Sequence, residues 1–225
     1  FYPFSTNKRD LSSFRKRLYW HCHFIQKLET EPELEFSSMH RMCDNLREKE
    51  NSELIERWIS GETGFPFMDA CMKYLKERGW INFRMRAMIM SFASYNLWQP
   101  WQVTSPLLAE LFVDYEPGIH IPQVQMQSGV TGINLPRIYS VTKQSRDQDP
   151  EAIWMKKVLP SLNDFDIEDI HNANLNEKYI IPIVDLKESS KHARDKIWGA
   201  RKGSEFKTIA RSVYLKHGSR KRRNA

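Results

Sequence analysis

Apolar side chains recur every three or four positions along most of the first half of the chain. Between residues 11 and 29 the apolar positions fit one face of a helix. They are Leu11, Phe14, Leu18, Phe24, Ile25 and Leu28. Similar spacing predicts further helices over residues 52–60, 66–79, 81–98 and 105–115. The first half of the chain is therefore predicted to be helical throughout.

Glycine and proline mark where several of these helices end or begin. Gly61 and Gly79 follow two amphipathic stretches, and glycine is the residue that most often ends a helix. Pro100 limits the helix predicted over 81–98. Ser105 followed by Pro106 has the form of a helix cap with proline in the first turn, which places the start of the next helix there.

The pattern changes around residues 114–150. The stretch 116–150 holds three glycines, four prolines and many amide side chains. It is longer than the usual connection between helices. We therefore expect a long irregular segment, and such segments commonly carry binding functions.

The remainder returns to helical patterns. Helices are predicted over 151–162 and 166–175, followed by a stretch over 179–202 that is extended at first and then helical. No alternation of strands and helices is visible, which predicts an all-α fold. We expect one helical domain over residues 1–200, then a final helix and a disordered basic tail over 201–225.

Composition narrows the class of protein. The 225 residues are long enough to bury a full core, and no apolar run approaches the roughly 20 residues of a membrane span. Three dispersed cysteines argue against a disulfide framework and for a reducing compartment, so a cytoplasmic location is expected. No metal site is predicted. The net charge of +6 includes the basic tail, so it permits nucleic-acid binding without establishing it.

One stretch carries a specific resemblance. The sequence WISGETGFPFMDACMKYLKERGWINFRMRAMIMSFASYNLWQPW, residues 58–101, resembles the FAD-binding helical domain of the DNA photolyase/cryptochrome family. The matching positions are Trp58, Gly61, Thr63, Gly64, Pro66, Asp69, Ala70, Met72, Gly79, Trp80, Arg84, Arg86, Ser91, Phe92 and Trp101. The resemblance covers about residues 14–165. It implies a helical bundle that binds FAD.

The resemblance also implies a flavin site. The expected FAD-binding residues are Trp80, Arg86, Asp114, Tyr115, Glu116 and His120. An ion pair between Arg86 and Asp114 would lie beside the flavin ring, where the guanidinium stabilises negative charge on the reduced ring. An arginine on an apolar helix needs such a partner in any case, so a purely structural salt bridge is the alternative.

Electron transfer is implied through tryptophan. Trp101 matches the middle member of the family's three-tryptophan chain, whereas the two flanking positions fall near Val124 and Glu48. Trp98 or Tyr95 is the candidate replacement, and a role for both as core aromatics is equally open. His120 falls where the family faces the flavin ring and is expected to influence its protonation; the alternative is a loop histidine bonded to a carbonyl.

A DNA-binding face is implied as well. Its expected residues are Arg17, Trp20, His21, Phe83, Arg84, Arg137 and Gln144. Trp20 would stack on a base flipped out of DNA. However, Arg17, Phe83 and Ala87 replace the family's lesion-contacting Glu, Asn and Met.

Three functions are consistent with these features. The leading hypothesis is a photolyase-like lyase that binds FAD and DNA with UV lesions and repairs pyrimidine dimers by light-driven electron transfer. The altered lesion contacts favour the alternative, a cryptochrome-like blue-light sensor without repair activity. The family's phosphate-binding segment and antenna domain would lie before Phe1. We therefore expect a missing N-terminal region or a partner chain, and a DNA-binding relic without flavin is the third hypothesis.

Overall fold

The protein is all-α, as predicted. The computed structural model describes residues 8–47, 49–175 and 178–218, and no strand occurs within these ranges. The α-helices are α1 (Lys8–Thr30), α2 (Ser52–Ser60), α3 (Pro66–Arg78), α4 (Phe83–Ser91), α5 (Trp101–Ala109), α6 (Pro117–Ser128), α7 (Val141–Gln148), α8 (Ile153–Val158), α9 (Ile167–Asn172), α10 (Leu186–Ala200) and α11 (Ser204–His217). Shorter helical turns are η1 (Pro32–Glu35), η2 (Arg41–Leu46), η3 (Phe92–Asn96) and η4 (Pro160–Leu162).

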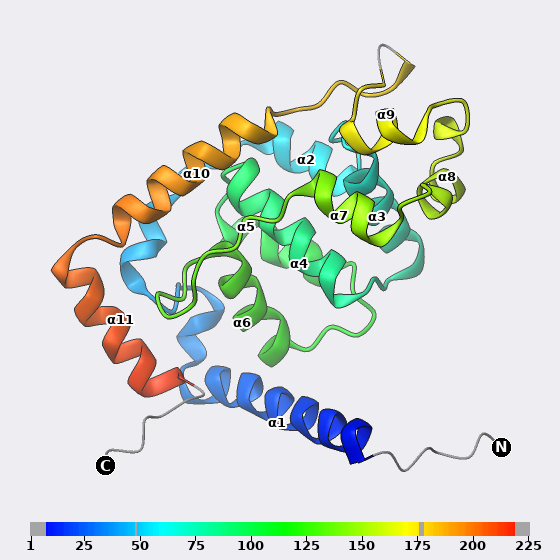
Figure 1. Ribbon diagram of the computed structural model, residues 1–225. Helices are drawn as coiled ribbons and strands as arrows, with labels where there is room; N and C mark the ends of the chain where they lie inside the picture. The colour runs from blue at the N-terminus through cyan, green and yellow to red at the C-terminus, as the bar shows by residue number, and fades with distance from the viewer. Residues whose placement is uncertain (1–7, 48, 176–177, 219–225) are drawn as a thin grey trace.

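α4 lies near the middle of the molecule, and α3 lies to one side of it, beside α7 and α8 (Figure 1). The apolar positions of α3 are buried on nearly all sides, which explains why its sequence shows little polar face. α8 and α9 lie at one corner, and α10 and α11 run along one edge (Figure 1). α1 packs its C-terminal part against α6, while the side chains of residues 9–22 are exposed.

Two glycines set close contacts that shape the later site. Gly79 ends α3 at φ 71°, and a Cβ there would lie 2.3 Å from Cγ1 of Val113. The amide N–H of Val113 donates to the carbonyl of Gly79 at 3.0 Å. Gly118, in the first turn of α6, lets the backbone of Ile25 in α1 approach to 2.9 Å of where its Cβ would be. Both contacts need the small residue.

The prediction of a long irregular segment around residues 114–150 was wrong. It contains two helices, α6 and α7, and only the stretch between them is irregular. Pro117 occupies the first turn of α6, where proline is tolerated, and the Glu116 side chain caps that turn by accepting from the Gly118 N–H at 3.0 Å. Glycine and proline were therefore misinterpreted as evidence against helix.

The helices on either side of Pro100 also differ from prediction. α4 continues into a π-helical turn, η3, which ends at Asn96. α5 begins at Trp101, four residues before the predicted start, so Pro106 lies inside the helix. α5 ends at Ala109, and Asp114 and Tyr115 consequently lie in the connection to α6.

Two of the sequence predictions concern residues outside the described ranges. Glu48 and most of the basic tail, residues 219–225, lie outside them. Among the helices that are described, none has the combination of length and apolar character needed to cross a bilayer. Cys22, Cys43 and Cys71 are free thiols.

Candidate functional site

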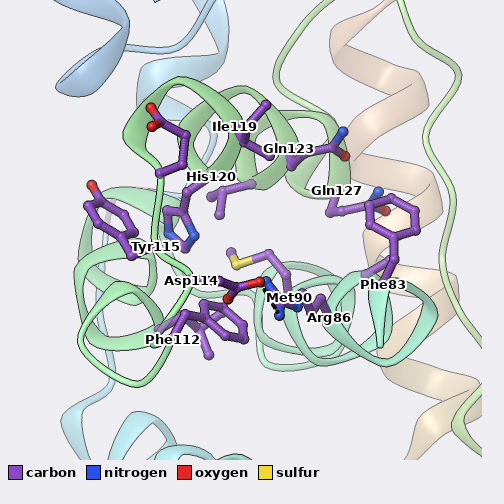
Figure 2. Close-up of a pocket in the computed structure, with 14 residues that line it drawn as sticks. Phe83, Arg86, Met90, Phe112, Asp114, Tyr115, Ile119, His120, Gln123 and Gln127 are labelled. Atoms are coloured by element: carbon purple, nitrogen blue, oxygen red, sulfur yellow. Dashed lines mark hydrogen bonds and ion pairs between the residues drawn. The ribbon is translucent and has the colours of Figure 1, made fainter. Parts of the chain in front are cut away.

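A cleft of about 110 Å³ lies between α4 and α6 and is closed at one end by the connection that carries Asp114 (Figure 2). α4 contributes Phe83, Arg86 and Met90, and α6 contributes His120 and further side chains along one face. The complete lining is Phe83, Arg86, Ala87, Met90, Leu108, Phe112, Asp114, Tyr115, Glu116, Ile119, His120, Gln123, Val124 and Gln127.

The predicted ion pair is present at the floor of this cleft (Figure 2). Nη2 of Arg86 lies 2.9 Å from Oδ2 of Asp114, and Nε of Arg86 donates to the carbonyl of Ile81 at 2.8 Å. The Arg86 guanidinium also lies 4.2 Å from the centre of the Phe112 ring. Three contacts therefore fix the cation, while a quarter of its side chain, 24%, remains exposed.

The position of Asp114 follows from local sequence. The hydrogen bond from Val113 to Gly79 holds the connection against the end of α3, and glycine is needed there because a Cβ would meet Val113. Asp114 follows directly and so reaches α4. The Asp114 side chain is 47% exposed, which leaves carboxylate oxygen available for a further partner.

His120 lines the opposite wall of the cleft (Figure 2). Its Nε2 lies 3.0 Å from both the carbonyl oxygen and the hydroxyl of Ser105. The ring packs against Tyr115 with 5.3 Å between centroids. Burial lowers the pKa of His120 below its usual value despite the hydrogen bond with Ser105, and the nearby Arg86 charge adds to the effect.

The expected flavin-binding residues come together with one exception. Five of the six line the cleft: Arg86, Asp114, Tyr115, Glu116 and His120. Trp80 does not; it is 51% exposed, and its ring centre lies 5.8 Å from the Arg86 guanidinium. The prediction omitted the apolar side chains of the cleft and Gln123. The helical spacing of α6 could have identified Gln123, had that helix been predicted.

The candidate electron-transfer tryptophans lie elsewhere. Trp101 is buried, and its Nε1 donates to the Ser38 hydroxyl at 3.0 Å. Trp98 lies 4.5 Å beneath the buried Arg47 guanidinium. A positive charge at that distance opposes removal of an electron from the indole. Neither indole lines the cleft, and their roles remain predictions.

The residues expected at DNA occupy different surroundings. Arg17, Trp20 and His21 are exposed on α1, and Arg84 is exposed on α4. Phe83 is also exposed and lines the mouth of the flavin cleft rather than a separate surface.

Two further DNA candidates follow α4 in the chain. Arg137 is exposed, and its backbone carbonyl accepts from the Ser91 hydroxyl at 3.2 Å. Gln144 is buried at 7% exposure, so its side chain is not at the surface as a direct DNA contact requires. The DNA contacts of the exposed residues among these remain predictions.

Comparison with known proteins shows the family. The family model described as the FAD binding domain of DNA photolyase matches residues 14–199, most of the chain. The chain therefore belongs to the DNA photolyase family and corresponds to its FAD-binding domain. The match to this FAD-binding family model confirms FAD as the expected cofactor.

Individual relatives agree with this assignment. A deoxyribodipyrimidine photo-lyase of Alkalihalophilus pseudofirmus is 26% identical over 80% of this chain and 41% of its own length. A cryptochrome DASH of Gloeobacter violaceus is 29% identical over 63% of this chain and 31% of its own length. The crystal structure of an archaeal photolyase from Sulfolobus tokodaii with two FAD molecules has a TM-score of 0.78 at 28% identity, covering 83% of this chain and 44% of that one. The chain thus spans less than half the length of these relatives.

The cleft fits one edge of a flavin ring. Its volume of about 110 Å³ is well below the roughly 300–1,000 Å³ of pockets that enclose a whole ligand, so only part of FAD can lie inside. The polar groups match such an edge. Arg86 supplies a cation, and Oε1 of Gln123 is buried without a hydrogen-bond partner among the described residues. A ring with N–H and carbonyl groups satisfies both.

Proposed function

We propose that this chain binds FAD with the isoalloxazine ring edge in the cleft between α4 and α6. The observation that carries the proposal is the Arg86–Asp114 ion pair, which is only half-buried and has a cleft beside it. An ion pair with a purely structural role needs no such opening, whereas a ligand-binding pair does.

The chain's own groups have distinct tasks in this proposal. When bound, FAD supplies electron transfer driven by blue light. Arg86 stabilises negative charge on the reduced ring, and Asp114 orients the guanidinium. Met90 and Phe112 exclude water, which strengthens the electrostatic effect of Arg86.

We further propose that the flavoprotein acts on DNA with UV-induced pyrimidine dimers, as a photolyase-like lyase. Exposed Arg17, Arg84 and Arg137 are suited to contact phosphates, and exposed Trp20 to stack on a flipped base. The deoxyribodipyrimidine photo-lyases among its relatives support this assignment.

A blue-light sensor without repair activity is the second candidate. The observation that favours it is the replacement of the family's lesion contacts by Arg17, Phe83 and Ala87. Ala87 is buried and apolar, and Phe83 has no hydrogen-bonding group, so neither can bond to the carbonyls of a dimer. The cryptochrome DASH relatives are consistent with this alternative.

Irradiation of defined DNA distinguishes the two functions. The chain loaded with reduced FAD is incubated with an oligonucleotide carrying one thymine dimer, in blue light and in the dark. Repair predicts loss of the dimer, measured by chromatography, in light only. An unchanged dimer, together with a light-induced change in the flavin absorbance spectrum, contradicts repair and supports the sensor.

We also propose a cytoplasmic location. Cys22 is an exposed free thiol, and Cys43 and Cys71 are buried free thiols. Burial raises the pKa of Cys43 to about 11, so it is unreactive. Three unpaired thiols are typical of a reducing compartment.

A further inference from the structure

The C-terminal end of α11 is fixed beside the start of η1. Glu31 directly precedes η1, and its Oε2 lies 2.8 Å from Nζ of Lys216 and 2.7 Å from Nε2 of His217. The His217 side chain is buried, which holds this contact in place. Figure 1 shows the same end of α11 next to the C-terminal end of α1. The chain therefore leaves α11 at a defined point beside η1.

A groove of about 500 Å³ lies at the other end of η1. Glu35 and Phe36 line it from η1, while Glu110 and Tyr115 line it from the end of α5 and the connection to α6. The side chains of Phe36 and Tyr115 are 74% and 44% exposed. Exposed aromatic rings beside carboxylates suit a cationic side chain, above all arginine, whose planar guanidinium stacks on rings.

The groove carries negative charge that no cation neutralises within residues 8–47, 49–175 and 178–218. Glu33, Glu35 and Glu110 are exposed, and none of them forms an ion pair in these ranges. Burial and the charges of Glu35 and Glu116 raise the pKa of Tyr115. In a chain whose net charge is +6, an acidic groove of this kind is complementary to the chain's own most basic part.

That basic part follows α11 directly. Residues 219–225 have the sequence SRKRRNA, which contains four consecutive cations and no acid. Glu35 lies about 8 Å along η1 from Glu31, because a 3₁₀ helix rises about 2 Å per residue. Seven residues span at most about 25 Å when extended. The four cations are therefore within reach of the groove.

We propose that the groove between η1 and α5 is a docking surface for residues 219–225 of the same chain. Arginine side chains of this segment pair with Glu35 and Glu110 and stack on Phe36 and Tyr115. Docking occupies the cations that a polyanion would otherwise attract, so it lowers the affinity of the chain for polyanions by competition. It involves no group of the flavin cleft except Tyr115, and it does not require FAD.

Carbodiimide cross-linking locates the docked segment. The chain used carries Arg220→Lys, Arg222→Lys and Arg223→Lys, which keep the charge and provide an amine at each cation. The reagent activates a carboxylate, and the amine then forms an amide as the reagent leaves as a urea. We expect amides with Glu35 or Glu110 within single chains, identified by mass spectrometry of the monomer in 50 mM salt. Links only between two chains, links only to other carboxylates, or no links at all overturn the proposal.

Trypsin cleavage measures protection of the segment in the natural chain. Trypsin cuts after lysine and arginine, so docking slows cleavage after residues 220–223. The groove variant Glu35→Gln, Glu110→Gln is compared with the control variant Glu53→Gln, Glu56→Gln, which removes two exposed acids of α2. Circular dichroism establishes that both are folded.

We expect cleavage of the groove variant in 50 mM salt to be about fourfold faster than that of the natural chain or the control variant. Two exposed ion pairs are lost, and each contributes roughly a twofold effect. In 0.5 M salt the three rates should be equal, because salt screens exposed charges. Equal rates of the two double variants in 50 mM salt overturn the proposal.

Binding of a heparin hexasaccharide tests the competition. Its dissociation constants are measured by calorimetry in 50 mM salt for the two double variants, which have the same net charge. The groove variant should bind about fourfold more tightly than the control variant, and truncation after Gly218 should abolish this difference. Equal affinities of the two full-length variants, or a difference that survives truncation, contradict competition by the docked segment. None of these measurements uses FAD, so their failure leaves the proposed FAD binding untouched.

Discussion

Two carboxylates from the regions that resemble the flavin-binding family have opposite surroundings. Asp69 in α3 is fully buried and accepts four hydrogen bonds. Its donors are the Thr63 N–H at 2.7 Å, the Thr63 hydroxyl at 2.6 Å, the Gly64 N–H at 3.1 Å and the Tyr179 hydroxyl at 3.0 Å. Asp69 thereby ties the turn before α3 to the extended segment before α10.

Asp114 has a single charged partner, Arg86, and 47% of its side chain is exposed. Asp114 lines a cleft, whereas the Asp69 side chain is fully buried. The comparison shows how one residue type serves structure where all its lone pairs are used, and is available for binding where some are free. Motif resemblance alone does not separate these cases.

The largest expected effect is a loss of stability when Asp69, the structural carboxylate, is removed. Asp69→Ala leaves four buried or half-buried donors without an acceptor and should lower the free energy of unfolding by about 4 kcal/mol or more. Urea denaturation measures the change. Asp114→Ala is the matched control, with an expected loss below about 1 kcal/mol because the pair is partly exposed. Equal losses in both variants would remove the distinction.

Lys27 is a buried side chain of the opposite charge, and it lacks the partners that Asp69 has. Lys27 is 9% exposed, and among the described residues no carboxylate lies within ion-pair distance; burial lowers its pKa to about 8. The charged lysine is therefore less stable in the folded chain than in the unfolded chain, where water solvates it. Lys27→Met should raise the free energy of unfolding by about 2 kcal/mol, measured by urea denaturation. No gain, or a loss, would indicate an undetected partner.

Gly79 tests how Asp114 is positioned. Gly79→Ala forces a side chain into a left-handed conformation and against Val113. We expect a loss of about 1–2 kcal/mol in unfolding free energy and weaker FAD binding, because Val113 immediately precedes Asp114.

The second variant separates the two causes. Adding Val113→Ala to Gly79→Ala removes the methyl groups that the new Cβ meets. FAD affinity should recover while most of the stability loss from the strained backbone remains. Unaltered FAD affinity in the single variant would contradict a role for Gly79 in placing Asp114.

The smallest expected effect concerns pH. Burial lowers the pKa of His23, His120 and His217 below the usual 6.5. The unfolded chain then binds more protons than the folded one below pH 6.5, so stability falls as the pH falls. A decrease of about 1 kcal/mol in unfolding free energy is expected from pH 7.5 to 5.5, measured in urea. Stability that is constant or rises toward pH 5.5 would contradict these directions.

The sequence was informative where local pattern and motif coincide. Helical spacing together with a terminal glycine located α2 and α3, and the motif paired Arg86 with Asp114. The prediction from sequence failed at α6, where two prolines and a glycine are typical of a loop. The helix forms because its packing against α1 compensates for the poor helix propensity of these residues. Gln123 was missed with that helix, since an unpaired buried atom is visible only in three dimensions.

The central claim is that the Arg86 cleft holds FAD, and a titration tests it most directly. Binding of FAD to the purified chain is followed by flavin fluorescence for the natural sequence, Arg86→Leu and the exposed control Arg84→Leu. We predict saturable binding that is weakened about 30-fold or more by Arg86→Leu, equivalent to the roughly 2 kcal/mol or more lost with one partner of a charged pair, and little changed by Arg84→Leu. Equal affinities of the Arg86 and Arg84 variants would contradict the claim.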